Sequence, residues 1–179
     1  SGGLATMGFN LPAGIGVCVA NSNEPVIVVT GEGSLQQNIQ ELQTIKHYNF
    51  PIKLFVINNG GYLSIRETQK RFFAGNLAGE SESSGVSFPD TEKIATAYGI
   101  KYFKADSNSN LTDIIKDALE FQGPVVCEVF SLVDQKVLPT NMAEVRPDGS
   151  MASKPLEDMY PFLDRDEFLE NMIVKIIEE

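Results

Sequence analysis

Short apolar runs alternate with amphipathic segments along this chain, and the alternation predicts strands and helices in turn. Residues 26–30 (VIVVT), 53–57 (KLFVI) and 125–130 (VVCEVF) are largely apolar, as is typical of parallel strands buried on both faces. Between the first two runs, apolar side chains recur on one helical face at Leu35, Ile39, Leu42 and Ile45. Strand, helix and strand in this order form a βαβ unit. We therefore expect an α/β fold, a three-layer α/β/α sandwich with a mostly parallel sheet.

Local sequence motifs predict where this helix begins and which elements follow the second strand. Ser34, followed three residues later by a glutamine, predicts an N-terminal cap. Further on, the pattern predicts a helix over 91–98, a strand over 100–105 and a helix capped by Asn110. The Gly- and Ser-rich stretch at 71–90 predicts a long loop, and long loops in compact domains are often functional.

Composition and charge narrow the class of protein. The 179 residues include 14 Lys and Arg against 24 Asp and Glu, so the formal net charge is −10, which disfavours a nucleic-acid partner. No apolar run approaches the roughly 20 residues that span a bilayer, so we expect no membrane partner. Residues 133–161 are predicted to be irregular before a last helix that begins after Asp164, and we expect one domain over residues 1–179.

The chain has only two cysteines and one histidine. Cys18 and Cys127 each lie in an apolar stretch, so we expect two buried free thiols and a cytoplasmic protein. His47 is the only histidine and is predicted to lie on the surface of a helix, which leaves a zinc site of the usual kind without ligands.

Two strand ends carry residues suited to an anionic ligand and a metal. Gly31-Glu32-Gly33-Ser34 follows the first strand and leads into a helix, where backbone N–H groups favour a phosphate. Asn58-Asn59-Gly60-Gly61 follows the second strand, and a carboxylate with an amide oxygen suits Mg²⁺ or Ca²⁺. Each segment is also compatible with an ordinary turn. A P-loop lysine motif and a dinucleotide fingerprint are both absent.

Taken together, these segments resemble the thiamine diphosphate-dependent enzymes. Their motif is GDG followed some 25–30 residues later by NN, and here Asn59 follows Glu32 by 27 residues. MGFNLPAGIG upstream is similar to the MGxxLPAAIGA of acetolactate synthases and their relatives, and NNGGYLSIRETQKRFF and PLEDMYPFL are similar to that group as well. The resemblance covers nearly the whole chain and rests on several linked motifs.

The resemblance implies a set of ligands for the cofactor and its metal. Mg²⁺ would be bound by the side chains of Glu32 and Asn59 and by the backbone carbonyl of Gly61. The family has Asp where this chain has Glu32, so either the loop has adjusted or metal binding is weakened. Arg66, Lys70 and Arg71 follow the motif and could face an anionic substrate, but charged residues after a loop are usually solvated, so they are not taken as site residues. The positions that match cofactor contacts are Ala5, Met7, Gly31, Gly33, Ser34, Asn59, Gly61 and Tyr62. Simple core packing is the alternative for Met7, and a packed aromatic beside the motif is the alternative for Tyr62.

The resemblance also implies an activity that this chain completes only with a partner. The family decarboxylates a 2-keto acid such as pyruvate and transfers the acyl carbanion equivalent to an acceptor, as a transferase or lyase. The activating glutamate belongs to the pyrimidine-binding domain of a partner subunit, so no catalytic residue is expected in this chain. We expect the C-terminal part of a longer homodimeric or homotetrameric enzyme. A simple 2-keto acid decarboxylase, an enzyme for an activated sugar ketone and a non-catalytic module with weakened cofactor binding are the alternatives.

Overall fold

The computed structural model describes residues 4–136, 138–145 and 148–174. By its contacts the chain forms two compact units, residues 1–135 and 136–179, and each is described by itself. The first unit carries both sequence motifs at the ends of its strands.

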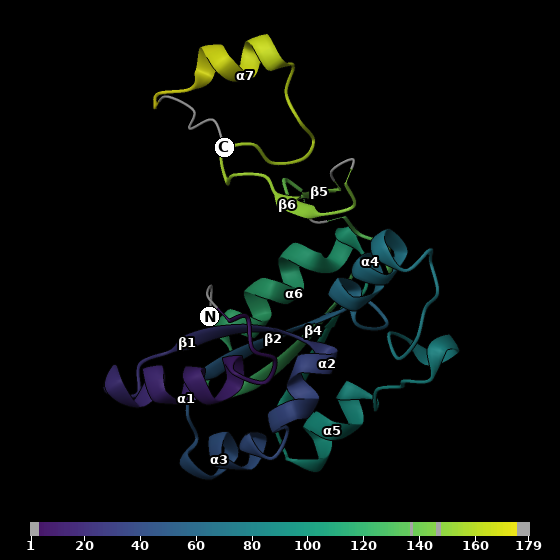
Figure 1. Ribbon diagram of the computed structural model, residues 1–179. Helices are drawn as coiled ribbons and strands as arrows, with labels where there is room; N and C mark the ends of the chain where they lie inside the picture. Colours follow the sequence, from purple (N-terminus) through teal and green to yellow (C-terminus); the bar gives the residue numbers. More distant parts are fainter. Residues whose placement is uncertain (1–3, 137, 146–147, 175–179) are drawn as a thin grey trace. The chain divides into compact units, whose positions relative to one another are not determined.

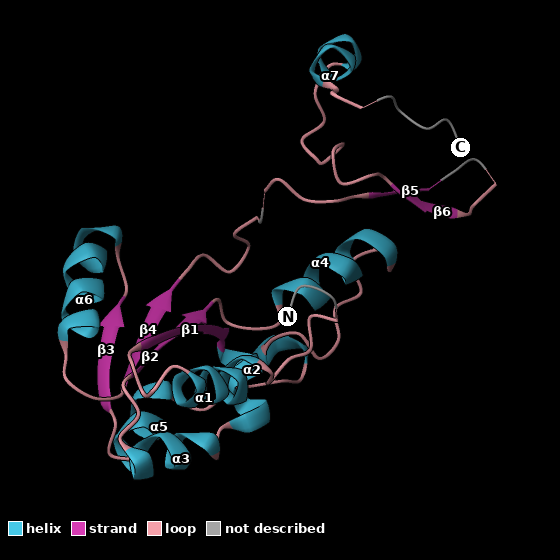
Figure 2. Ribbon diagram, turned by 90° about the vertical axis from the view of Figure 1, so that its left-hand side faces the viewer, coloured by secondary structure: helices cyan, strands magenta, loops and turns pink. Residues whose placement is uncertain are grey.

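The first unit is an α/β sandwich built on one parallel sheet. Its strands are β1 (Val26–Gly31), β2 (Ile52–Asn58), β3 (Lys101–Ala105) and β4 (Val125–Phe130), in the order β1-β2-β4-β3 with every pair parallel. Helices lie on both sides of this sheet (Figures 1 and 2). The expected three-layer α/β/α arrangement is therefore confirmed, and the sheet of this unit is wholly parallel.

Two apolar clusters hold the layers together. The larger one lies between the sheet and the helices α1 (Asn10–Ala20), α3 (Glu41–Tyr48) and α5 (Thr91–Ala97), and the smaller one lies under α6 (Asn108–Glu120) on the other face. Strand β2 is central and its first five residues are all buried, as its apolar run predicts. The described parts of the chain keep Cys18 and Cys127 as buried free thiols and leave His47 exposed, in agreement with the prediction.

Helix α1 packs closely on β1 because its sequence is rich in small residues. A Cβ atom on Gly14 would lie only 2.3 Å from Val28 Cγ2, so the helix can approach the strand at this distance only with glycine there. On the opposite face of β1 the expectation of full burial is wrong, because the side chains of Ile27 and Val29 are 60% and 53% exposed. Strand β1 is an edge strand, and α6 packs against β3 and β4 instead of against β1.

The helical segment between β1 and β2 is interrupted. It consists of α2 (Glu32–Leu35), the 3₁₀ turn η1 (Gln36–Asn38) and then α3, while Leu35, Leu42 and Ile45 are buried as expected. The predicted cap at Ser34 is wrong, because α2 begins at Glu32 directly after the extended Gly31. The Ser34 hydroxyl therefore lies inside the helix and accepts the Gly8 N–H at 2.9 Å instead.

The remaining elements of the first unit connect the strand ends. Helix α4 (Leu63–Phe72) follows β2, so the loop expected over 71–90 begins two residues later than predicted and contains a short 3₁₀ turn, η2 (Glu82–Ser84). Helix α6 is capped by Ser107, with Asn110 as the third helical residue of a capping box, so the cap predicted at Asn110 is misplaced by three residues.

The second unit is small. It contains an antiparallel pair, β5 (Ala143–Val145) and β6 (Met151–Ser153), which the prediction of an irregular tail missed, and the helix α7 (Arg165–Asn171). Asp164 caps α7 by accepting the Asp166 N–H, as its position predicts. Among the described residues, no helix combines the length and apolar composition that crossing a membrane requires.

The packing of β2 gives the first prediction. Replacing Leu54, which is 1% exposed, with Ala should lower the free energy of unfolding by about 2–5 kcal/mol, because it leaves a cavity in the larger cluster. The matched control Ile27→Ala removes a side chain that is 60% exposed and should cost roughly 0.5 kcal/mol or less. Urea unfolding followed by circular dichroism measures both, and equal losses would contradict the described packing.

Candidate cofactor and metal site

The two motifs meet at the carboxyl ends of β1 and β2. Gly31 ends β1 and Asn58 ends β2, and the two strands are neighbours in the sheet. Glu32 follows β1 at the start of α2 and is 4% exposed. Ligands of open α/β sheets bind at this edge, where the strands end and the loops begin. The structure therefore brings together segments that are 27 residues apart in the chain.

Glu32 binds the backbone of the loop that follows β2. Its Oε1 accepts the N–H of Asn59 at 3.2 Å and the N–H of Gly61 at 2.8 Å. Burial raises the pKa of Glu32 above its ordinary value, and the N–H groups of the loop, Gly61 first, act in the opposite direction. One carboxylate oxygen thus holds the Asn59–Gly61 turn against the end of β1.

The side-chain amide of Asn59 lies between the other two predicted metal ligands. Its terminal atom lies 3.3 Å from Glu32 Oε1 and 2.8 Å from Gly61 O. With the amide nitrogen in this position, Asn59 donates to both oxygens; with the amide turned over, three oxygen atoms face one another. Carboxylate, amide and carbonyl oxygens are ligands that Mg²⁺ and Ca²⁺ accept, so the donor set fits a hard divalent cation.

This convergence contains a single carboxylate. Within the part of the chain that the structure describes, no three His, Cys, Asp or Glu side chains are grouped so as to hold a metal ion. The net charge that the protein offers here is therefore small. A cation at this place would need further anionic ligands, such as phosphate oxygens, to complete its shell.

Two glycines of the motifs have no room for a side chain. A Cβ on Gly61, whose φ is +155°, would lie 2.2 Å from the carbonyl oxygen of Glu80. A Cβ on Gly33 would lie 2.2 Å from Cε1 of Tyr62. The Tyr62 ring thus rests directly on the turn after β1, and it also packs edge-to-face on Phe88 with the ring centroids 5.1 Å apart.

The segment before α1 is attached to the same turn. Ser34 Oγ accepts the Gly8 N–H, and Asn38 Nδ2 donates to the Gly8 carbonyl at 2.7 Å. Because the Ser34 hydroxyl acts as acceptor here, its own proton can be donated to another group. Met7 precedes Gly8 and is 45% exposed, while Ala5 has a positive φ of +49°. The predicted cofactor contacts Met7 and Ser34 therefore lie near each other.

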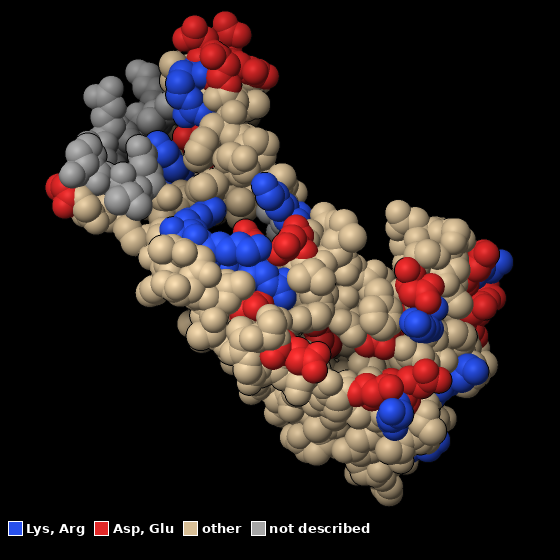
Figure 3. Space-filling view, turned by 90° about the vertical axis from the view of Figure 1, so that its right-hand side faces the viewer, with Lys and Arg blue, Asp and Glu red and all other residues tan. Residues whose placement is uncertain are grey.

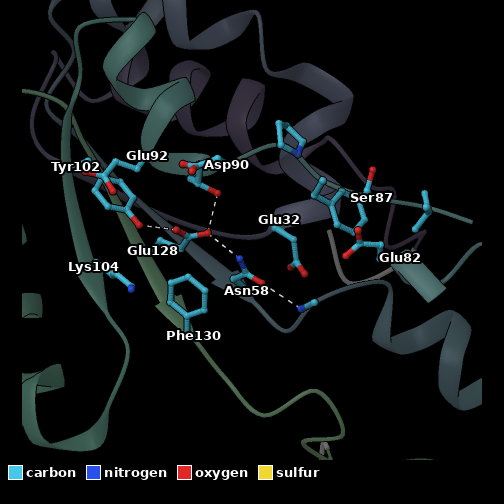
Figure 4. Close-up of a pocket in the computed structure, with 15 residues that line it drawn as sticks. Glu32, Asn58, Glu82, Ser87, Asp90, Glu92, Tyr102, Lys104, Glu128 and Phe130 are labelled. Atoms are coloured by element: carbon cyan, nitrogen blue, oxygen red, sulfur yellow. Dashed lines mark hydrogen bonds between the residues drawn. The ribbon is translucent and has the colours of Figure 1, made fainter. Parts of the chain in front are cut away.

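A cavity of about 460 Å³ opens beside Glu32, at the ends of β2, β3 and β4 (Figure 4). At its wall lies the carboxylate of Glu128, which is 4% exposed and has no place among the predicted site residues. It accepts hydrogen bonds from Asn58 Nδ2 at 2.8 Å, Thr91 Oγ1 at 2.7 Å and the Tyr102 hydroxyl at 2.5 Å. Burial and Glu128 both raise the pKa of Tyr102, so this hydroxyl stays protonated and donates.

One signal could have indicated Glu128. It is the only charged residue in the run VVCEVF, and a carboxylate in a buried strand has to find hydrogen-bond donors. Asn58, the first residue of the Asn pair, supplies one of them, so the two asparagines of the motif point to different carboxylates.

Figure 3 shows that acidic and basic side chains both occur on one face of the molecule.

The charged side chains after the second motif are not all solvated. Arg66, expected at the surface, is 3% exposed and paired with the buried Glu80. Lys70 is partly exposed and pairs with Asp134 at 2.7 Å. Sequence position alone does not predict that Arg66 is buried and Lys70 is exposed, because burial on α4 depends on which side chains of the following loop pack against the helix.

Comparison with known proteins decides the family. The sequence profile of the thiamine pyrophosphate enzymes, C-terminal TPP binding domain, matches residues 1–129. The chain belongs to this family. Thiamine diphosphate, another name for the same cofactor, is thereby implied as the ligand of the TPP-binding domain, and the resemblance found in the sequence motifs is confirmed.

The named relatives are acetolactate synthases. The chain is 42% identical to the acetolactate synthase large subunit of Porphyra purpurea over 131 residues, which are 72% of this chain and 22% of that protein. It is 36% identical to acetolactate synthase 2, chloroplastic, of Zea mays over 143 residues, 78% of this chain and 22% of that protein. The chain thus spans about a fifth of these relatives. Since the name of the maize protein places it in the chloroplast, a cytoplasmic location stays a prediction.

The buried carboxylate of Glu32 gives a prediction on pH. Because its pKa is raised in the folded chain, ionised Glu32 lowers stability once the pH exceeds the unfolded value of about 4.3. Glu32→Gln should therefore raise the melting temperature of the metal-free chain at pH 7, and this gain should vanish as the pH falls to about 4. Thermal melts across this range measure it, with the exposed Glu24→Gln as a control that should show little change. A gain independent of pH would contradict the assignment.

The contact between Gly33 and Tyr62 gives a third prediction. Gly33→Ala places a Cβ 2.2 Å from a ring atom, so the ring or the turn must move, at a cost of about 1–3 kcal/mol in the free energy of unfolding. Gly16→Ala is the matched control, since no atom other than those of its chain neighbours and its own helix backbone lies within 4 Å of the added Cβ, and alanine favours the helix by up to about 1 kcal/mol. Chemical unfolding of both variants tests this, and a Gly33→Ala chain as stable as wild type would refute the close contact.

Proposed function

We propose that this chain holds the diphosphate and the Mg²⁺ of thiamine diphosphate in an acetolactate synthase-like enzyme that acts on a 2-keto acid such as pyruvate. The observation that carries the proposal is the convergence of Glu32, the Asn59 amide and the Gly61 carbonyl at the ends of two neighbouring strands. Family membership supports the cofactor, and the converging oxygens support the metal.

The side chain of Glu32 is one methylene longer than the Asp of the family, and its two carboxylate oxygens can take different roles. Oε1 receives the N–H groups of Asn59 and Gly61, so we assign Oε2 to the cation. The Asn59 amide would turn its oxygen toward the cation and give up its own hydrogen bonds to Glu32 and Gly61. On this account the loop has adjusted to a glutamate, and cation binding is retained.

Neighbouring groups are suited to the diphosphate and to the rest of the cofactor. The Ser34 hydroxyl accepts from Gly8 and keeps its proton for a phosphate oxygen, and we propose that Gly31 and Gly33 contact the diphosphate through the backbone of the turn. The same bond from Gly8 to Ser34 keeps Met7 and Ala5 beside the turn, where we propose that they contact the organic part of the cofactor. Tyr62 would contact it through the ring that covers Gly33.

The reaction needs more than this chain. Thiamine diphosphate supplies the carbanion chemistry by which a 2-keto acid loses carbon dioxide and its acyl group reaches an acceptor. The residues proposed here bind and orient the cofactor. The activating glutamate is proposed to come from a pyrimidine-binding domain of a partner subunit in a homodimer or homotetramer, in line with the share of its relatives that this chain spans. The isolated chain should then bind cofactor without turning over pyruvate.

Calorimetric titration of Mg²⁺ together with thiamine diphosphate tests the proposal. Asn59→Ala removes one oxygen ligand, so the apparent Mg²⁺ affinity should fall by at least tenfold, while the free energy of unfolding without metal should fall by only about 1–3 kcal/mol, because the Asn59 amide no longer donates to Glu32 and Gly61. The control Asn76→Ala alters an exposed asparagine in the loop after α4 and should leave the affinity unchanged. Absence of any binding to the wild-type chain, or equal affinities for the Asn59→Ala and wild-type chains, would contradict the proposed site.

A further inference from the structure

Arg66 is a buried cation that connects three segments near the proposed metal loop. It lies on α4 and is 3% exposed. Its Nε donates to Glu80 Oε2 at 2.5 Å, and its Nη1 donates to the carbonyl of Val133 after β4. Glu80 is itself 1% exposed, so both charges of this pair have been removed from water.

Glu80 carries the effect of Arg66 to the metal loop. Its other carboxylate oxygen, Oε1, accepts the hydroxyl of Ser81 at 2.5 Å, so both oxygens of the carboxylate are held by hydrogen bonds. Its backbone carbonyl accepts the Tyr62 N–H at 2.7 Å. The same carbonyl oxygen occupies the place that a Cβ on Gly61 would need, and Arg66 Nη2 lies 2.8 Å from that position. The guanidinium and the Glu80 carbonyl thus form the surface on which Gly61 rests.

Gly61 is in turn the residue whose N–H binds Glu32 and whose carbonyl faces the Asn59 amide. An unbroken series of contacts therefore runs from Arg66 through Glu80 and Gly61 to Glu32. We propose that Arg66, acting through Glu80, is a positioning residue that fixes the Asn59–Tyr62 loop in its cation-binding geometry. The expected effect on Mg²⁺ affinity rests on the proposed function, whereas the expected effect on the conformation of the loop does not.

A role in stability alone explains the pair poorly. Buried ion pairs are often no better for stability than well-packed apolar side chains of similar volume. Arg66 is also incompletely satisfied, because its Nη2 is the one buried side-chain nitrogen or oxygen without a hydrogen-bond partner among the described residues. What the guanidinium supplies is a planar fork that reaches Glu80 and Val133 in fixed directions, and an ammonium group or an apolar side chain cannot reproduce it.

The test separates positioning from stability. In the double variant Arg66→Met/Glu80→Met, two apolar side chains replace the ion pair, and Arg66→Lys keeps the charge without the fork. Lys70→Ala is the matched control, because Lys70 lies on the same helix as Arg66 but forms an exposed ion pair, with Asp134. For each chain we would measure the melting temperature, amide hydrogen exchange over residues 59–63 and in β2 without metal, and Mg²⁺ affinity in the presence of thiamine diphosphate.

The expected result is local. The double variant should keep a melting temperature close to wild type and unchanged exchange in β2, while exchange at Gly61 and Tyr62 rises at least tenfold and Mg²⁺ affinity falls at least tenfold. Arg66→Lys should lie between the double variant and wild type, and Lys70→Ala should match wild type. If the double variant fails to fold, Arg66→Lys decides instead: exchange at Gly61 and Tyr62 more than twofold above wild type supports the inference, and a smaller rise overturns it.

Exchange and affinity within twofold of wild type would overturn the inference and leave Arg66 a structural residue. If the wild-type chain binds no Mg²⁺, the proposed metal site fails. The exchange measured without metal still decides in that case whether Arg66 fixes the loop, so the two failures are distinguishable.

Discussion

The burial of one carboxylate at the end of β1 constrains the rest of this site. Glu32 is 4% exposed, and a carboxylate removed from water must be compensated by hydrogen-bond donors, a cation or a proton. The chain supplies the donors from the loop after β2, whose N–H groups at Asn59 and Gly61 point at one oxygen of Glu32. Two strands that are neighbours in the sheet are thereby joined at their ends by a side chain as well as by the ladder between them.

That arrangement demands glycine where the backbone approaches other groups. Gly61 lies against the Glu80 carbonyl and Gly33 lies against the Tyr62 ring, with no space for a Cβ at either position. The loop consequently depends on a second layer, in which the buried Arg66 and Glu80 hold the surface beneath it. The site therefore has two parts. The oxygens that would face a cation belong to Glu32, Asn59 and Gly61, and the Arg66–Glu80 ion pair would hold the loop that carries the last two.

Much of this fold is predictable from sequence, for reasons that are local. The runs 26–30 and 125–130 and the central strand are recognisable because strands covered by helices need apolar side chains. The turn at Glu32 and the loop at Asn59 are predictable as neighbours, since parallel strands bring their carboxyl ends to one edge. The family resemblance adds roles to these residues, and the family itself is confirmed.

What sequence did not predict depends on tertiary packing. Ile27 and Val29 are exposed because β1 is the edge strand, and strand order is invisible in a local pattern. The burial of Arg66 depends on Glu80, 14 residues away, and the role of Glu128 depends on three donors from three other elements. Such pairings are decided by the path of loops, for which periodicity carries no signal.

A crystal structure of this chain grown with thiamine diphosphate and Mg²⁺ would show whether the two strand ends hold the metal. We expect a cation about 2.0–2.1 Å from a carboxylate oxygen of Glu32, the side-chain oxygen of Asn59 and the carbonyl oxygen of Gly61, with diphosphate oxygens completing its shell. A bound cofactor whose cation contacts none of these oxygens, with the Asn59 amide still donating to Glu32, would contradict this expectation.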